Sequence, residues 1–301
     1  MNLAQKHHYL PRFYLKGFTN KKGFFYIYDC KSDRVNKREF HPNNIFYDDR
    51  NFIEVNGVKS DLPEQMYSVI DNRHSPLFKK IHEQKGPLQL DWQDKLTLLE
   101  FIVTIFGRLP SNEKLFENQL QSNIALKSNF KIVNKATGVP DQEMTDKIIG
   151  DAAFSKSIKA ILPIITKYNK IDETEFSRWQ FIYNPLGNNI CSDSPIIFKD
   201  ENPLDILDTD FVFPISNEHL LLRINKRVQG EVLPAPIMAY IQLLIFSQAN
   251  FYSCSSDQDF LNKAHAERKN MLPTNVLFNI LYNSEWLDSL NKEFLRRSPK
   301  L

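Results

Sequence analysis

The period of the hydrophobic pattern changes three times along the chain, and each change marks a different kind of secondary structure. In residues 1–60, short apolar runs rich in aromatic and β-branched residues stand between turn-forming residues, as in GFFYIYDC at 23–30. Such runs are typical of strands, and the Asn56-Gly57 pair is a hairpin turn signal. We therefore predict a small β-rich cap at the N-terminus, in which residues 34–40 return beside the first strand.

From Asp61 the apolar residues recur at helical spacing. One face of this predicted helix collects Tyr67, Ile70, His74, Leu77, Phe78 and Ile81. The next stretch, residues 91–110, is apolar almost all round a helical projection, so it predicts a central helix. That helix should end near Leu109, because the residue before a proline disfavours helical geometry. Residues 111–135 and 140–169 predict further helices.

Short apolar runs typical of strands return near Trp179 and cover about residues 178–225. Helical patterns resume at about residue 235 and continue to the C-terminus. This order places a β-rich cap at 1–60, a helical middle at about 61–170, a strand-rich segment at about 178–225 and C-terminal helices at about 235–301. The segregation of strands from helices predicts a predominantly helical α+β fold rather than an alternating α/β one. Neither an internal repeat nor a low-complexity linker interrupts the chain, so we expect one domain over residues 1–301.

Composition narrows the function classes. The chain has 301 residues, of which 42% are hydrophobic, and its 23 phenylalanines predict a core rich in aromatic packing. Its formal net charge of +2 is low for a general polyanion binder, which leaves room only for a local basic face. With nine glycines and neither a GxGxxG nor a GxxxxGK[ST] motif, the sequence argues against a glycine-rich phosphate loop.

Cysteine usage and hydropathy bear on the compartment. The three cysteines, Cys30, Cys191 and Cys254, lie far apart and form no CxxC pair, so we interpret them as free thiols in a reducing compartment. The N-terminus lacks the apolar run of a signal peptide, and the most apolar later run is too short to span a bilayer. The sequence therefore predicts a cytoplasmic protein with no membrane contact.

Short motifs recur in an order that resembles one known family. The motifs are HHYLPRFYLKGF at 7–18, LPEQMYSVIDNRHSPLFKKI at 62–81, FIVTIFGRLP at 101–110, CSDSPIIF at 191–198 and FPISNEHLLL at 213–222. Together they resemble the domain-of-unknown-function family 4238, whose members open with His-Tyr-(Leu or Val)-Pro. Leu109 and Asp71 depart from the pattern, because Thr and Glu are common there. The resemblance implies an uncharacterised, mostly prokaryotic soluble protein and, by association, a role in antiviral defence.

The opening motif has a structural and a chemical interpretation. Leu10 precedes Pro11 and is biased to extended geometry, while Pro11 suits the first position of a short helix with Tyr14 and Phe18 on one face. The segment would then be the first part of a core. Alternatively, His8 is held just before this rigid corner, as a general base or a metal ligand needs to be. We favour His8 over its neighbouring histidine because the family motif begins at His8.

The acidic helix and the end of the apolar helix supply further candidates. Asp61 and Glu64 form a variant of the capping box, so Glu64 has a structural explanation. Asp71 lies at the edge of the apolar stripe, where a carboxylate either pairs with a cation or belongs to a site. Arg108 can be explained by the helix dipole, but a buried arginine also needs an anion. We predict a buried or half-buried salt bridge from Arg108 to Asp71, with a substrate phosphate as the alternative partner.

Ser192 and Asp193 follow a turn-forming segment and precede Pro195. Their side chains would hold their own backbone in a local turn, or Asp193 would be an acidic ligand or the residue that orients His8. Because rigid segments carry both His8 and Asp193, we predict that the two side chains meet, with Ser192 or Asp71 within hydrogen-bond reach. A divalent metal bound by His8 and Asp193 would fit this arrangement.

Lys127, Lys131 and Lys135 recur every four residues and predict one basic ridge on a helix. The C-terminal KEFLRRSPK adds further cations at 292–300. Such a ridge is either a solvated face or a surface that contacts the phosphates of a nucleic acid.

Two functions from different classes follow. The first is a hydrolase, a nuclease or phosphodiesterase, in which His8, Asp71 and Asp193 hold a metal or activate water while Arg108 neutralises a phosphate. The second is a non-enzymatic sensor or interaction module, in which the same residues form a structural hydrogen-bond network. A hydrolase requires His8, Asp71, Arg108 and Asp193 to lie in one cleft. In an interaction module these side chains can lie in separate parts of the molecule.

Overall fold

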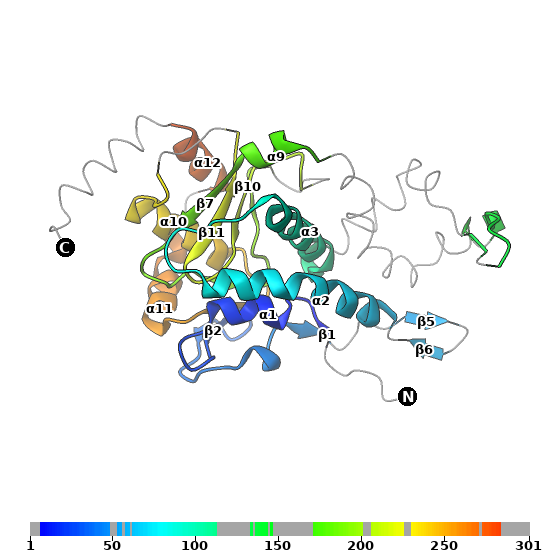
Figure 1. Ribbon diagram of the computed structural model, residues 1–301. Helices are drawn as coiled ribbons and strands as arrows, with labels where there is room; N and C mark the ends of the chain where they lie inside the picture. The colour runs from blue at the N-terminus through cyan, green and yellow to red at the C-terminus, as the bar shows by residue number, and fades with distance from the viewer. Residues whose placement is uncertain are drawn as a thin grey trace.

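The structure is a computed structural model, and it confirms the α+β class (Figure 1). It describes residues 7–48, 53–55, 58–60, 62–112, 133–134, 136–143, 145–146, 171–200, 206–225, 230–270 and 273–283. The helices predicted over 111–135 and 140–169 lie largely outside these residues.

An antiparallel sheet in the order β7-β11-β10-β9 forms the centre of the fold. Its strands are β7 (Trp179–Tyr183), β9 (Ile197–Phe198), β10 (Phe211–Pro214) and β11 (His219–Arg223), as the strand-rich pattern predicts. Successive side chains of a strand point to opposite faces. Phe211 and Phe213 therefore enter one hydrophobic cluster and Val212 enters the other. Both faces of the sheet are buried, which explains why these strands are continuous apolar runs rather than alternating ones.

One cluster lies between the sheet and three helices: α1 (Arg12–Leu15), α2 (Leu62–Glu83) and α3 (Trp92–Arg108). The predicted apolar face of α2 is buried along its length. A capping box of Asp91 and Asp94 begins α3. The helix ends at Arg108, and Leu109 adopts extended geometry before Pro110, as predicted. The short helices η1 (Lys16–Phe18), η2 (Pro42–Asn44), η3 (Pro110–Asn112) and α9 (Glu173–Ser177) connect these parts.

The second cluster packs the opposite face of the sheet against the C-terminal helices. These are α10 (Ala235–Ser247), α11 (Gln258–Glu267), which continues into η5 (Arg268–Asn270), and α12 (Thr274–Tyr282). Helices were predicted in this region. None of the helices within the described residues is long and apolar enough to cross a membrane.

The strands of the N-terminal region pair differently from a self-contained cap. A hairpin of β2 (Tyr26–Asp29) and β3 (Arg34–Val35) was predicted, but β2 also pairs with β12 (Tyr252–Ser255), which in turn pairs with β8 (Cys191–Ser192). Sequence reasoning missed β12, because its four residues directly follow an apolar helix. The predicted hairpin around Asn56-Gly57 is formed by β5 (Ile53–Val55) and β6 (Val58–Ser60). In addition, β1 (His7–His8) pairs with β4 (Tyr47–Asp48).

Tyr14 joins the opening segment to the rest of the core. Its ring stacks on Phe213 at 5.5 Å between centroids and meets Phe78 edge-on at 5.7 Å. Its hydroxyl donates a hydrogen bond to the carbonyl of Pro214 at 2.7 Å. Tyr14 and Phe18 lie on one buried face, as predicted. The structural interpretation of the opening motif is therefore confirmed.

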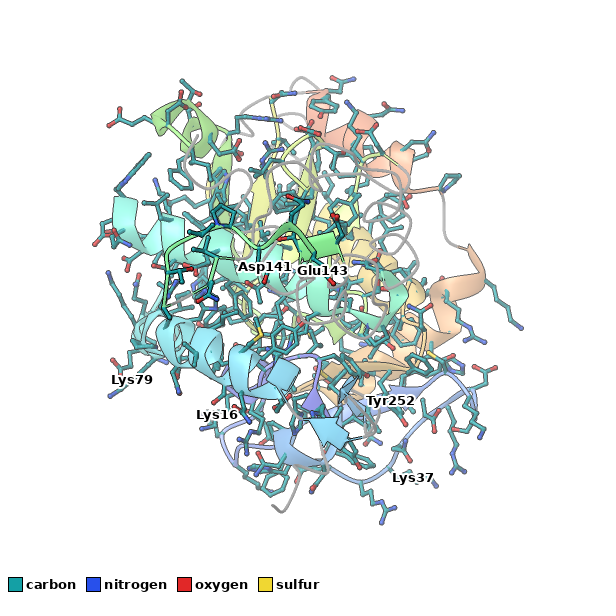
Figure 2. All side chains as sticks on the ribbon, turned by 90° about the vertical axis from the view of Figure 1, so that its right-hand side faces the viewer. Lys16, Lys37, Lys79, Asp141, Glu143 and Tyr252 are labelled. Carbon is teal, nitrogen blue, oxygen red and sulfur yellow. The ribbon has the colours of Figure 1, made fainter. Side chains whose placement is uncertain are left out.

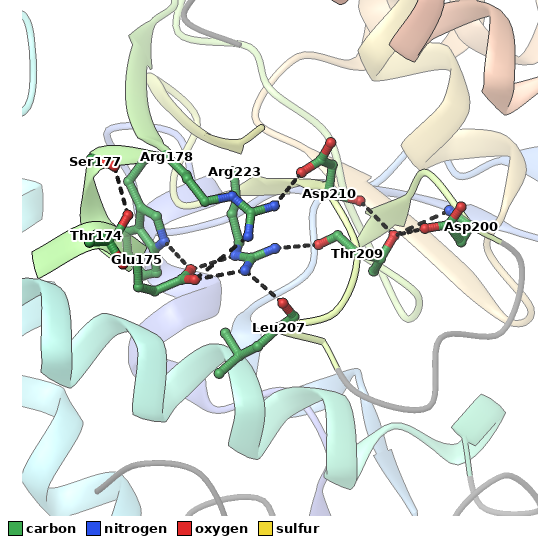
Figure 3. A network of polar contacts seen from close by, with 10 residues as sticks. Thr174, Glu175, Ser177, Arg178, Asp200, Leu207, Thr209, Asp210 and Arg223 are labelled. Atoms are coloured by element: carbon green, nitrogen blue, oxygen red, sulfur yellow. Dashed lines mark hydrogen bonds and ion pairs between the residues drawn. The ribbon is translucent and has the colours of Figure 1, made fainter. Parts of the chain in front are cut away.

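A buried ionic network closes one end of the sheet (Figure 3). The fully buried guanidinium of Arg223 makes two hydrogen bonds to the carboxylate of Glu175, one of them at 2.7 Å, and also donates to the carbonyls of Thr209 and Leu207. Next to it, Arg178 donates to Asp210 at 2.7 Å. Since removing one partner of a buried pair leaves an uncompensated charge, each member of the network depends on the others.

We expect Glu175→Gln to lower the free energy of unfolding by about 3–5 kcal/mol, because it leaves the charge of Arg223 buried without a counterion. Glu173→Gln is the matched control, since Glu173 is an exposed residue of the same short helix, and it should change stability by no more than about 0.5 kcal/mol. Urea unfolding measures both variants. If both substitutions lowered the free energy of unfolding by the same amount, a stabilising role for the network would be contradicted.

Candidate functional site

Three of the predicted site residues line one pocket. The pocket has a volume of about 570 Å³ and contains His8 of β1, Asp71 of α2 and Arg108 of α3, which three separate elements bring together. Its wall also includes Arg12, Lys16, Glu64, Ser68, Asn72 and Ser75. This volume lies within the usual range of small-molecule sites.

The position of His8 is set by a short antiparallel pair and by the corner that follows it. His8 lies opposite Tyr47 in the β1–β4 register, and the two rings meet edge-on at 5.6 Å. Three residues later, Pro11 caps α1 with extended geometry, at φ −60° and ψ 140°. His8 is half-buried at the edge of the pocket. The strand pairing and the proline corner thus fix the backbone from which the imidazole projects.

The predicted salt bridge is confirmed. Arg108 donates to Asp71 at 2.8 Å, and the two side chains are 4% and 23% exposed respectively. The guanidinium also lies 4.1 Å from the ring centre of Tyr67, within the range of a cation–π contact. Burial raises the pKa of Tyr67 to about 12, although the charge of Arg108 opposes the shift. The pair is therefore partly buried, and its arginine is held on two sides.

The acidic residues of the pocket are paired, whereas two of its cations are not. Glu64 contacts the buried His7 at 3.2 Å, and Asp71 contacts Arg108. Asp61, the predicted cap of α2, lies outside the described residues. Within the part of the chain that the structure describes, the side chains of Arg12 and Lys16 make no polar contact and are exposed. The pocket therefore has surplus positive charge that could bind an anionic ligand.

Asp193 and Ser192 belong to a different part of the molecule. Asp193 is 1% exposed, and its carboxylate accepts hydrogen bonds from the backbone N–H groups of Asn250, Phe251 and Tyr252, the first at 2.8 Å. The Ser192 hydroxyl accepts a bond from the N–H of Ser194 at 3.2 Å. Neither residue lines the pocket of His8. The structure thus assigns Ser192 to a local turn and Asp193 to support of the distant backbone at 250–252, and it does not place Asp193 in the pocket of His8.

The predicted metal site gains no support from the geometry. Among the described residues, no group of three or more His, Cys, Asp or Glu side chains is placed to hold a metal ion. The proposed ligand pair of His8 and Asp193 is divided between a pocket and a buried turn. Lys127, Lys131 and Lys135, the predicted basic ridge, cannot be placed either: Lys127 and Lys131 lie in an undescribed stretch, and Lys135 is likewise outside the described residues.

Sequence reasoning missed a second pocket, of about 910 Å³, which shares Lys16 with the first. His82 lines it and packs so closely on the backbone of Gly17 that a Cβ there would lie 2.6 Å from Nε2. Burial, together with the neighbouring charges of His219 and Lys16, lowers the pKa of His82 to about 4. A neutral imidazole therefore faces this pocket. The sequence signal was weak, because His82 follows the apolar stripe of α2 as one polar residue among several.

His219, which also lines the second pocket, is bonded on both ring nitrogens. Nδ1 lies 3.0 Å from the hydroxyl of Ser216, and Nε2 lies 2.8 Å from the carbonyl of Gly86. Since a carbonyl can only accept, Nε2–H donates to Gly86, and Nδ1 shares its hydrogen bond with the Ser216 hydroxyl. Both side chains are nearly inaccessible to solvent. The arrangement ties the loop after α2 to the turn between β10 and β11.

The fold and the first pocket define an α+β protein with a cationic, histidine-containing site. A family model matches residues 6–270, so the chain belongs to the family of proteins of unknown function DUF4238. This match confirms, over most of the chain, the family resemblance that the sequence motifs indicated. No curated protein and no solved structure matches the chain.

The buried carboxyl of Asp193 should make stability depend on pH. Burial raises its pKa from 3.8 to about 6, and the three backbone N–H donors only partly offset this. Between these pH values the folded state holds a proton that the unfolded state lacks, so this residue's contribution to stability falls as pH rises. Relative to Asp193→Asn, the wild type should gain up to about 3 kcal/mol of unfolding free energy between pH 7 and pH 4.

Urea unfolding of both proteins at the two pH values measures this difference. Using the difference removes the contributions of the other carboxyl groups, which both proteins share. A stability advantage of the wild type that shrinks on acidification would mean that the N–H donors, rather than burial, determine the pKa of Asp193.

Proposed function

We propose that the protein is a hydrolase of phosphodiesters that binds a phosphate group in the pocket of His8, Asp71 and Arg108. The observation that carries the proposal is the convergence of these three side chains, from distant segments, on one pocket. The sequence-based condition for a hydrolase was that His8, Asp71, Arg108 and Asp193 share one cleft, and without Asp193 the catalytic assignment was to give way to the interaction module. Asp193 lies elsewhere, so the proposal made here is a different one, in which the other three residues form the site without it.

Charge supports a phosphate as the ligand. The two carboxylates of the pocket are each paired, and Arg12 and Lys16 stay available. Asp71 occupies one nitrogen of Arg108, so the remaining N–H groups of this guanidinium can bond to a ligand oxygen. Arginine suits this role because its planar donors match the oxygens of a phosphate. Asp71 and Tyr67 would hold the guanidinium in position for that contact.

In the proposed reaction His8 is the general base. It would take a proton from a water molecule that attacks phosphorus, and one P–O ester bond would break. The leaving alkoxide would take a proton from solvent and protonated His8 would return its proton to solvent, giving an alcohol and a phosphomonoester. Arg12, Lys16 and Arg108 would neutralise the negative charge that the phosphoryl oxygens carry in the transition state. A nucleic acid is one substrate with this chemistry, and a role in antiviral defence rests on the family resemblance alone.

The second candidate is a non-enzymatic sensor that binds a phosphate-bearing ligand in the same pocket. It is favoured by the extent to which the polar residues already satisfy one another, since His7 bonds to Glu64 and Arg108 bonds to Asp71. Under this alternative His8 would contribute to binding and to the edge of the core, without a proton transfer.

We expect His8→Ala to fold and to bind ligand, but to hydrolyse a phosphodiester about 10²–10⁴-fold more slowly, as the loss of a general base predicts. The change should cost about 1 kcal/mol of stability, the order of one lost ring contact such as that with Tyr47. Arg12→Ala should instead weaken binding about tenfold, or 1.4 kcal/mol. Lys263→Ala is the matched control, because Lys263 is exposed on α11 and lines neither pocket.

Binding is measured by calorimetry with inorganic phosphate and a nucleoside monophosphate, and turnover with bis(4-nitrophenyl) phosphate, with EDTA and again with Mn²⁺. Ligand binding by the wild type without turnover in either condition would support the sensor instead of the hydrolase. If the wild type bound neither inorganic phosphate nor the nucleoside monophosphate, the hydrolase and the sensor proposals would both be wrong. Insolubility of His8→Ala would place His8 in the core, and His8→Gln would then report on the chemistry.

A further inference from the structure

We infer that the ligand of this site is a single-stranded nucleic acid, which runs from the His8 pocket past Lys16 into the second pocket. The inference rests on the proposed function and extends it from one phosphate to a chain of nucleotides. Its basis is that the two pockets are neighbours, because Lys16 lines both of them. Figure 2 labels Lys16 on the molecule.

Helix α2 borders both pockets with one face. Glu64 and Asp71 line the first pocket and His82 lines the second. His82 follows Glu64 by about five turns at 3.6 residues per turn, which returns it to the same side of the helix. At 1.5 Å per residue, Asp71 and His82 lie about 16 Å apart along the helix axis. Helix α1 lies beside α2 (Figure 1). Because Lys16 lines both pockets, we treat them as two parts of one path that is longer than one nucleotide.

Cations are spaced along this path. Arg12 and Lys16 lie at the first pocket, and Lys21 and Lys85 lie at the second. All four are exposed, and within the described residues none of their side chains makes a polar contact. A row of available cations fits a chain of phosphates better than it fits a single phosphate. These cations therefore favour the backbone of a polynucleotide at the first pocket and along the lysine-bearing edge of the second, which also carries three carboxylates.

The other residues that line the second pocket have a different character. They include the amide side chains of Asn188 and Asn217 and the hydroxyl of Ser256, while Tyr26 offers a half-buried aromatic ring. Amide and hydroxyl groups can bond to the edges of bases, and an aromatic ring is a platform on which a base stacks. Glu218, Asp257 and Asp259 also line this pocket and would repel phosphates. The phosphates would therefore follow the edge that carries Arg12 and the lysines, and the bases would face the amide and hydroxyl groups.

The volumes also favour a chain over a mononucleotide. The first pocket, of about 570 Å³, is sufficient for one nucleotide, and the second, of about 910 Å³, is larger still. A single strand can place unstacked bases in such pockets, whereas the bases of a duplex are paired and stacked. A ligand that uses the whole path is thus a single strand of several nucleotides.

Fluorescence polarisation with labelled oligothymidylates of one to eight nucleotides tests this inference with the full chain. Affinity should rise at least tenfold between one and about four nucleotides and then level off. Lys21→Ala and Lys85→Ala should each weaken binding of the eight-nucleotide strand about tenfold. Each should also reduce the slope of log affinity against log salt by about 0.7, the value for one contact to a single strand. Both residues are exposed, so both variants should fold.

The controls separate this inference from the proposed function. Neither substitution should change inorganic phosphate binding or bis(4-nitrophenyl) phosphate turnover, and Lys263→Ala should not change affinity for the strand. If phosphate and mononucleotide bind while affinity is independent of length, the extended path is wrong and the proposed function stands. An equal loss in Lys263→Ala would reveal non-specific attraction and overturn the path. If no phosphate compound binds at all, the proposed function fails together with the inference.

Discussion

The packing of Tyr14 is the contact on which the arrangement of the N-terminal half depends. Its ring lies among Phe18, Phe78, Phe101 and Phe213, and its hydroxyl donates to the carbonyl of Pro214. One side chain thus joins the opening segment, α2, α3 and the central sheet. Because a buried hydroxyl without a partner is costly, the bond to the strand also sets the depth at which α1 enters the core.

The docking of α1 places the polar residues around it. His8 lies just before the Leu10-Pro11 corner, while Arg12 and Lys16 lie on the side of α1 that is turned away from the core. The same rigid segment thus supplies a half-buried histidine and two exposed cations to one pocket. Asp71 and Arg108 complete the wall from α2 and α3, where they pair at the edge of the apolar cluster. A functional site and the start of a core are compatible here, because they use opposite sides of one short helix.

The interior consists mainly of packed aromatic and aliphatic side chains and also contains a few buried ionic groups. The central sheet is covered on both faces, and Arg223 at its end is neutralised by Glu175 and by two carbonyls. Asp193 is buried too, but its support comes from the backbone of the segment before β12. These groups join elements that are distant in sequence, which makes them structural partners even where their chemistry resembles that of a catalytic residue.

Local patterns alone determined the helices α2, α3 and α10, the strands of the central sheet, and the end of α3 at Arg108, since period, turns and proline geometry act between near neighbours. The spacing of Asp71 on its helix and the burial of Arg108 were sufficient to predict their salt bridge. Only the tertiary structure decided that β2 pairs with β12, that Asp193 supports a turn away from His8, and that Lys16 joins two pockets. These three outcomes depend on contacts between segments that are distant in sequence. No local sequence pattern predicts such contacts.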